Sequence, residues 1–219
     1  MDFLYNITFA VADANVSLLE VISTLCGLLC VFLAGRASVA NFWVGYAYNI
    51  LLFMLFWNKN LYASMLLQPV SLFINAMGHW RWTHPKVGEE NVNKQLKVTL
   101  MKWRQRGALL LAISAAVVLW GFVLGNLDSW WPGVFPAARS PYLDATVAVM
   151  ILCAQFLSAQ KRLECWIVWL AVDIAQIILY LTSGLVFMPA VSAIYLVLAA
   201  MGLAQWRKQL NTQDNVADK

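Results

Sequence analysis

The stretch QPVSLFINAMGHWRW, residues 68–82, decides the fold, because its last part is repeated later in the chain. Residues 76–82 read AMGHWRW, and residues 200–206, at an offset of 124, read AMGLAQW. In the first copy, Gln68, Ser71 and Asn75 fall close to one face of a helix, since seven residues make nearly two turns. A duplicated apolar helix with a polar stripe is the first prediction.

The composition is that of an integral membrane protein. Of the 219 residues, 62% are hydrophobic and only 12% are charged, so a soluble domain is excluded. Because a span takes roughly 20 residues, the predicted fold class is all-α with seven transmembrane helices. These are predicted at about 18–35, 39–57, 60–82, 107–125, 142–160, 164–182 and 185–206.

The duplication covers three spans. With no gap and an offset of 124, residues 17–82 lie over 141–206, and 14 of the 66 positions are identical, which is hard to obtain by chance. The same register pairs Asn49 with Asp173. A unit of three spans ends on the opposite side of the membrane, and the single helix at 107–125 returns the chain. The arrangement predicted is a parallel 3+1+3 repeat, known among transporters.

The basic residues predict how the chain is oriented in the membrane. The predicted orientation comes from the positive-inside rule, because 13 of the 15 Lys and Arg residues fall on one side. The N-terminus should lie outside and the C-terminus in the cytoplasm, and topology alone explains the net charge of +4 without a nucleic-acid partner. The repeat and the linker helix divide the chain into five parts. These are an N-terminal interfacial segment expected as a short helix or strap (1–16), repeat one (17–82), a cytoplasmic loop plus linker helix (83–140), repeat two (141–206) and a cytoplasmic tail (207–219).

A seam of rings and polar groups marks the sixth span. An ionised carboxylate inside a span costs at least about 2.5–3.5 kcal/mol, so Asp173 should face a cavity or a partner helix. The matching seam of the second span keeps only Asn49 polar, and the third span contributes two amides. The predicted substrate-binding residues are Gln68, Asn75, Trp166, Trp169, Asp173, Asn49, Gln176 and Tyr180.

Other interpretations of these residues stay open. Trp166, near a span end, also suits an interfacial aromatic belt, and Asp173 also suits a structural hydrogen bond. Trp82 and Trp206 are expected to be belt anchors, while Gly78 and Gly202 are expected to let helices approach closely.

No chemistry-bearing motif appears beyond these. The four cysteines show no CxxC or Cys/His clustering, so neither a metal site nor a cofactor is predicted. The sequence also lacks a phosphate-binding GxxxxGK[ST], a nucleophile elbow and an HExxH. No catalytic residue is therefore assigned, and the chain is not expected to be an enzyme.

An ordered set of residues across the chain resembles the PnuC family of nicotinamide riboside transporters. The set is Glu20 before Gly27-Leu-Leu-Cys30, Asn41, Asn49, Leu61-Tyr-Ala-Ser64 leading to Gln68, Asn75, Gly78-x-x-x-Trp82, Asp144, Trp166-x-x-Trp169 and Gly184. The resemblance implies a SWEET-like fold in a bacterial inner membrane. It also implies uptake of nicotinamide riboside by facilitated diffusion, with intracellular phosphorylation trapping the substrate for NAD synthesis.

Two other functions and one assembly remain as alternatives. Relatives of this family are thought to carry thiamine or riboflavin, so another vitamin is the competing substrate. A membrane-embedded enzyme is disfavoured because no catalytic constellation assembles. Membrane lipids are expected partners, and a homotrimer is a further expectation.

Overall fold

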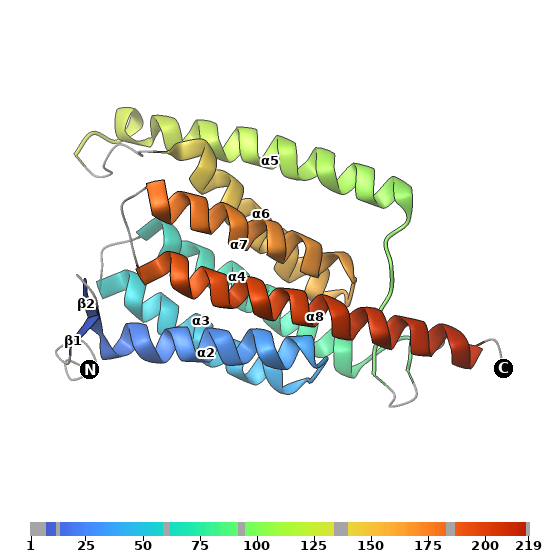
Figure 1. Cartoon of the computed structure of the whole chain (residues 1–219). Helices are drawn as coiled ribbons and strands as arrows, with labels where there is room; N and C mark the ends of the chain where they lie inside the picture. Colours follow the sequence, from blue (N-terminus) through green and yellow to red (C-terminus); the bar gives the residue numbers. More distant parts are fainter. Residues whose placement is uncertain are drawn as a thin grey trace.

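The computed structural model describes residues 8–11, 14–58, 62–91, 95–133, 140–182 and 187–217. Within these ranges a short hairpin precedes seven helices (Figure 1), and each helix overlaps one of the seven predicted spans. The all-helical prediction for the membrane part is therefore confirmed. The elements are β1 (Thr8–Val11), β2 (Ala14–Ser17), α2 (Leu18–Gly35), α3 (Ala40–Asn58), α4 (Tyr62–Thr83), α5 (Trp103–Trp130), α6 (Pro141–Ala159), α7 (Glu164–Thr182) and α8 (Phe187–Ala217).

The N-terminal segment forms a hairpin where a helix was one of two expectations. β1 pairs antiparallel with β2, with Thr8 opposite Ser17. The helix expectation is wrong for the described residues, and β-branched residues such as Val11 and Val16 favour the extended backbone. Ser17 then caps α2: its backbone N–H donates to Glu20 Oε2 at 2.7 Å, while the Glu20 N–H donates to Ser17 Oγ at 3.3 Å.

Five helices, α2, α3, α5, α6 and α8, are long and apolar enough to cross a membrane. The two remaining helices carry most of the predicted site residues, and each packs between two of the five. α4 contacts α3 and α6, and α7 contacts α6 and α8. The chain is thus a multi-pass membrane protein whose polar helices are flanked by apolar ones.

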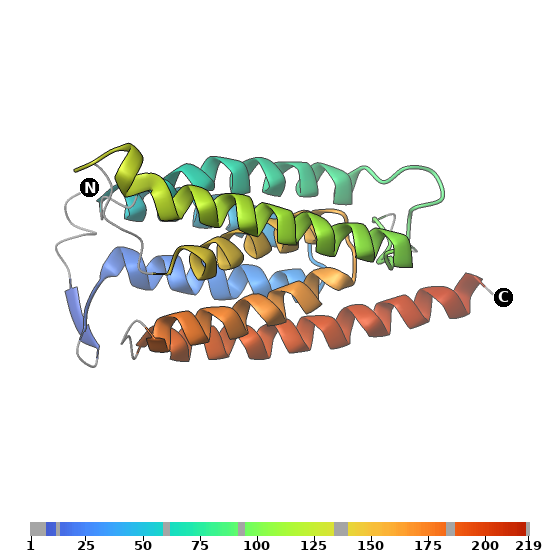
Figure 2. The ribbon, with the colours of Figure 1, turned by 90° about the horizontal axis from the view of Figure 1, so that it is seen from above.

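Six of the helices form a ring. α2, α3, α4, α6, α7 and α8 contact one another in this order, and α8 returns to α2 (Figures 1 and 2). α5 packs on α6 outside the ring and is longer than the 107–125 predicted for it. α8 continues past 206 to Ala217, so the predicted tail begins as helix.

The two contacts that close the ring between the repeats are equivalent. In the α4–α6 seam, Trp82 Nε1 donates to the Ser158 carbonyl at 3.1 Å. In the α2–α8 seam, Trp206 Nε1 donates to the Ala34 carbonyl at 3.0 Å. The two donors are 124 residues apart in the sequence, and so are the two acceptors, which is the offset of the sequence repeat.

An aromatic layer crosses the ring at these seams, and it corrects one prediction. Trp82 and Trp206 are 0% exposed, so they are not belt anchors. The ring centroids of Trp82 and Trp206 are 5.7 Å apart. Phe42 packs on Trp82 with centroids 4.9 Å apart, and Trp166 packs on Trp206 with centroids 5.5 Å apart. The aromatic layer comprises Phe42, Trp82, Trp166 and Trp206, all of which belong to the main hydrophobic core.

Two glycines make room for the layer. A Cβ on Gly202 would lie 2.5 Å from the Trp166 ring, and a Cβ on Gly78 would lie 2.8 Å from the Phe42 ring. Neither position accepts a larger residue without movement of a ring. The packing role predicted for both glycines is confirmed.

Candidate functional site

The repeat-related pair Asn49 and Asp173 lies at mid-length of α3 and α7, inside the bundle. Asn49 is 9% exposed and Asp173 is 4% exposed. The Asn49 amide donates to the Gly45 carbonyl of its own helix at 2.7 Å. A carboxylate buried to this degree inside a membrane bundle is costly, which makes Asp173 a candidate for ligand contact.

Two tyrosines join Asp173 at this depth. Tyr48 of α3 and Tyr195 of α8 are hydrogen-bonded, and Asp173 acts electrostatically on Tyr195. Gly27 of α2 makes room for them, since a Cβ there would collide with the Tyr195 hydroxyl and lie 3.1 Å from the Tyr48 ring. Four helices of the ring thus contribute to one polar centre, defined here as Gly27, Tyr48, Asp173 and Tyr195.

Sequence reasoning missed both tyrosines. Tyr48 adjoins Asn49, and Tyr195 aligns with Ser71 at the repeat offset. A comparison of the two copies would have shown that both carry a hydroxyl at this position, on serine in the first copy and on the larger tyrosine in the second. That contrast is the signal the sequence offered.

The amides of α4 are arranged differently from one another. Asn75 Nδ2 donates to the Phe42 carbonyl at 2.9 Å, and its amide packs over Gly45. Asn75 therefore joins α4 to α3 directly. Gln68, two turns earlier on the same helix, is half-buried.

The predicted seam of α7 is divided by the structure. Trp166 is 2% exposed within the aromatic layer, and its Nε1 has no hydrogen-bond partner among the described residues. Trp169 is half-buried and packs against the same core. Asp173 lies two turns, about 10 Å, beyond Trp166 along the helix. Gln176 is half-buried, and the side chain of Tyr180 lies outside the described ones.

One further polar group on α6 has an unused hydrogen-bonding atom. Gln155 Oε1 is buried and finds no partner in the described parts of the chain. Buried amide oxygens are nearly always hydrogen-bonded in folded proteins. Gln155 is therefore an additional candidate for contact with a ligand.

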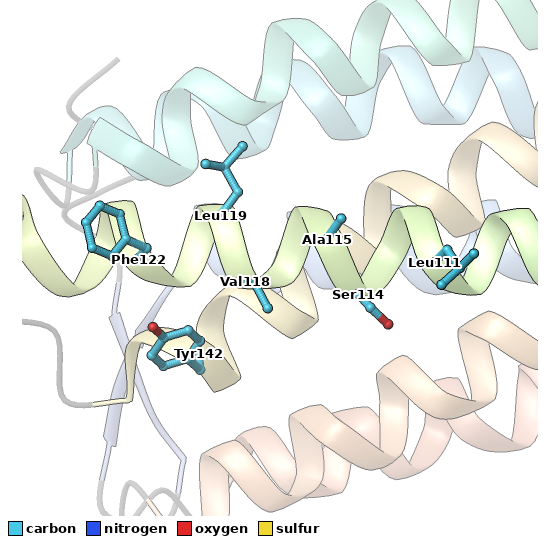
Figure 3. Close-up of a pocket in the computed structure, with 7 residues that line it drawn as sticks. All are labelled: Leu111, Ser114, Ala115, Val118, Leu119, Phe122 and Tyr142. Atoms are coloured by element: carbon cyan, nitrogen blue, oxygen red, sulfur yellow. The ribbon is translucent and has the colours of Figure 1, made fainter.

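A surface pocket lies apart from these residues. It lies along α5 beside the helix α6 on which α5 packs, and Figure 3 shows Tyr142 of α6 beside the α5 side chains. Its walls are almost entirely apolar, as expected of a surface that faces lipid tails. The lining residues are Leu111, Ser114, Ala115, Val118, Leu119, Phe122 and Tyr142.

Comparisons with known proteins agree with this architecture. The chain is 25% identical to the nicotinamide riboside transporter PnuC of Escherichia coli K12, with 96% of this chain and 92% of the relative covered. It is 24% identical to the riboflavin/roseoflavin transporter RibM of Streptomyces davaonensis, with 94% and 92% covered. A crystal structure of the vitamin B3 transporter PnuC matches with a TM-score of 0.63 at 22% identity, covering 89% of this chain and 83% of that one, which shows a shared fold.

A family model defines the relationship more firmly than any single relative. The model described as nicotinamide mononucleotide transporter matches residues 17–208, from the residue that caps α2 to just past Trp206 of the aromatic layer. The match spans both repeats and the helix between them. This membrane protein therefore belongs to the nicotinamide mononucleotide transporter family.

Proposed function

We propose that the chain carries nicotinamide riboside across a bacterial inner membrane by facilitated diffusion, and that intracellular phosphorylation traps the substrate for NAD synthesis. The observation that carries the proposal is the polar centre, where the buried carboxyl group of Asp173 lies with the half-buried phenols of Tyr48 and Tyr195 inside the ring of helices. Family membership supports a transport role, and relatives of similar length are named nicotinamide riboside transporters.

The chemistry of the substrate matches the groups available. Nicotinamide riboside has a pyridinium cation, a carboxamide and a ribose. Asp173 would offset the cation, and the hydroxyls of Tyr48 and Tyr195 would contact the ribose. Gln155 and Gln68 offer amides that pair with a carboxamide.

Among the tryptophans, the proposed substrate contact is Trp169. Trp166 is enclosed by the aromatic layer and serves helix packing, whereas Trp169 lies one turn nearer to Asp173. A desolvated cation over an indole ring gains about 2 kcal/mol, enough to matter for affinity. Asn75 holds α4 against α3 through its bond to the Phe42 carbonyl and thereby positions helices that carry the site.

The proposed topology is seven crossings in a parallel, SWEET-like 3+1+3 arrangement, with the N-terminus periplasmic and the C-terminus cytoplasmic. The equivalent seams at an offset of 124 residues support the repeat. The Lys and Arg residues gathered in residues 81–106, at 161–162 and at 207–208 support the orientation. A homotrimer stays a prediction, to be tested by native mass spectrometry.

Transport is tested with purified protein in liposomes. Labelled nicotinamide riboside should equilibrate across the bilayer without ATP or an ion gradient. Accumulation above the outside concentration would rule out facilitated diffusion. Conversion of the substrate to a new compound in the same vesicles would instead indicate an enzyme.

Substrate identity is tested by calorimetric titration with nicotinamide riboside, thiamine and riboflavin. Riboflavin is the second candidate because one relative is named a riboflavin/roseoflavin transporter. Asp173→Asn should weaken binding of the cationic nicotinamide riboside by roughly tenfold, or 1.4 kcal/mol, and leave neutral riboflavin unaffected. Trp169→Ala and Asn75→Ala should also weaken binding, and unchanged affinity in both would refute the assigned site.

A further inference from the structure

The two seams of the aromatic layer are equivalent in sequence but are not held equally. Each seam has a tryptophan that donates to the last turn of a neighbouring helix, followed by a turn residue with positive φ: Ala37 at 55° and Lys161 at 53°. Ala37 and Lys161 are also 124 residues apart. Only the α4–α6 seam therefore carries a lysine at this position.

Lys161 is buried against the layer. It is 1% exposed, and its Nζ lies 4.4 Å from the centroid of the Trp82 ring. Arg36, the cation nearest to Ala37 in the other turn, lies over Phe32 of its own helix instead. Trp206 has no matching cation contact among the described residues.

A strap, residues 95–101, adds to the same side. Leu96 N–H donates to the Trp82 carbonyl at 3.4 Å, and Thr99 N–H donates to the Lys161 carbonyl at 3.1 Å. The strap is held at its end by Glu164, whose Oε1 accepts from Met101 N–H at 2.9 Å. In the described chain, no segment lies along the turn at 36–39 in this way.

We propose that Lys161 is a positioning residue that holds Trp82, so that the aromatic layer opens at the α2–α8 seam and stays closed at the α4–α6 seam. The layer lies across the ring, and a substrate leaving the polar centre toward the α8 C-terminal end must pass it. The proposal rests on the proposed transport function only in requiring a passage along the ring axis. It makes one half of the barrier fixed and the other mobile.

The test compares equivalent positions in one background. With Cys26, Cys30, Cys153 and Cys165 replaced by alanine, Ala34→Cys and Ser158→Cys place a single thiol beside each seam. Both are reconstituted in nanodiscs with nicotinamide riboside and treated with an impermeant maleimide. Ala34→Cys should react at least about fivefold faster, in keeping with the strength of one cation–π contact. Equal rates, or faster reaction at Ser158→Cys, would overturn the proposal.

Variants of the lysine separate positioning from general stability. Lys161→Met should raise the Ser158→Cys rate about fivefold without lowering the melting temperature, and Lys161→Arg should keep it slow. Lys102→Met, which removes an exposed lysine at the same end, is the matched control and should change nothing. An unchanged Ser158→Cys rate in Lys161→Met contradicts the role of the lysine.

A measurement on the unmodified protein guards against variants that fail to fold. Hydrogen–deuterium exchange should be faster in residues 33–40 than in 157–164, and the reverse order would also refute the proposal. Titration of nicotinamide riboside on the same samples distinguishes the two hypotheses. Lost binding with unequal seams contradicts the proposed substrate alone, whereas normal binding with equal seams contradicts the unequal barrier alone.

Discussion

At the residue scale, Ala37 in the turn after α2 holds a backbone conformation that is unfavourable for any residue with a side chain. Its φ of 55° lies in the left-handed region, which costs a non-glycine residue about 1–2 kcal/mol and which helix C-termini usually assign to glycine. Ala37→Gly should therefore raise the melting temperature of the purified protein, by roughly 2 °C for a chain of this size. Gly88→Ala is the matched control, because Gly88 has φ 86° and open space around it, and it should lower the melting temperature. A lower melting temperature in Ala37→Gly would contradict this account.

Lys161 gives a pH-dependent prediction at the same scale. Burial lowers the pKa of Lys161 to about 8 from its usual 10.5, so the folded state releases the proton before the unfolded state does. Stability then rises with pH between about 8 and 10.5, and the penalty of burying the charge is fully present below pH 8.

The measurement is the difference in melting temperature between Lys161→Met and the wild type. The variant should be the more stable at pH 7, and the gap should close as the pH rises to 10. The neighbouring charges are engaged elsewhere, since Glu164 pairs with Arg106 at 2.7 Å and Arg162 donates to the Leu100 carbonyl. A gap that stays constant with pH would mean that the lysine is not buried as a cation.

At the scale of elements, Gly27 sets how closely α2 approaches α3 and α8. The Tyr195 hydroxyl and the edge of the Tyr48 ring occupy the space where a side chain on Gly27 would be. Gly27→Ala should displace Tyr195, break its bond with Tyr48, and weaken nicotinamide riboside binding about tenfold in calorimetry. Gly107→Ala, on α5 with open space around it, is the matched control and should leave affinity unchanged. Normal affinity in Gly27→Ala would remove the tyrosine pair from the site.

The helices themselves were predictable because each needs only a run of apolar residues, and the repeat fixed their order. Side-chain direction was not, because it depends on which neighbour each helix meets. Trp82 and Trp206 had the sequence context of membrane-surface anchors, yet their indoles turn inward to bond carbonyls of the other repeat. Asp173 was predicted to face an interior partner, and it does, but its neighbour Tyr195 comes from a helix that offered no polar stripe in the sequence.

At the scale of the whole molecule, the six-helix ring closes through two equivalent tryptophan contacts, while the two sequence copies that carry them differ elsewhere. Both halves keep the tryptophan bonds that close the ring, since losing either would open a seam. The polar centre draws on Gly27, Tyr48 and Tyr195, whose counterparts Ile151, Val172 and Ser71 are apolar or small. An asymmetric ligand needs unlike groups on its two sides, and the divergence of the repeats supplies them. The same reasoning applies to the barrier, where a lysine and a strap distinguish one seam from the other.

This asymmetry can be reversed in the intact chain. In Ala37→Lys combined with Lys161→Ala, the lysine moves to the equivalent turn, where the repeat geometry places it over Trp206 instead of Trp82. Maleimide should then react faster with Ser158→Cys than with Ala34→Cys, the opposite of the order expected without the exchange. Lys161→Ala alone should leave both thiols reactive, because neither tryptophan is then held. If the exchange leaves the original order, the strap at 95–101 rather than the lysine fixes the α4–α6 seam, since the strap bonds only backbone atoms of Lys161 and survives the substitution.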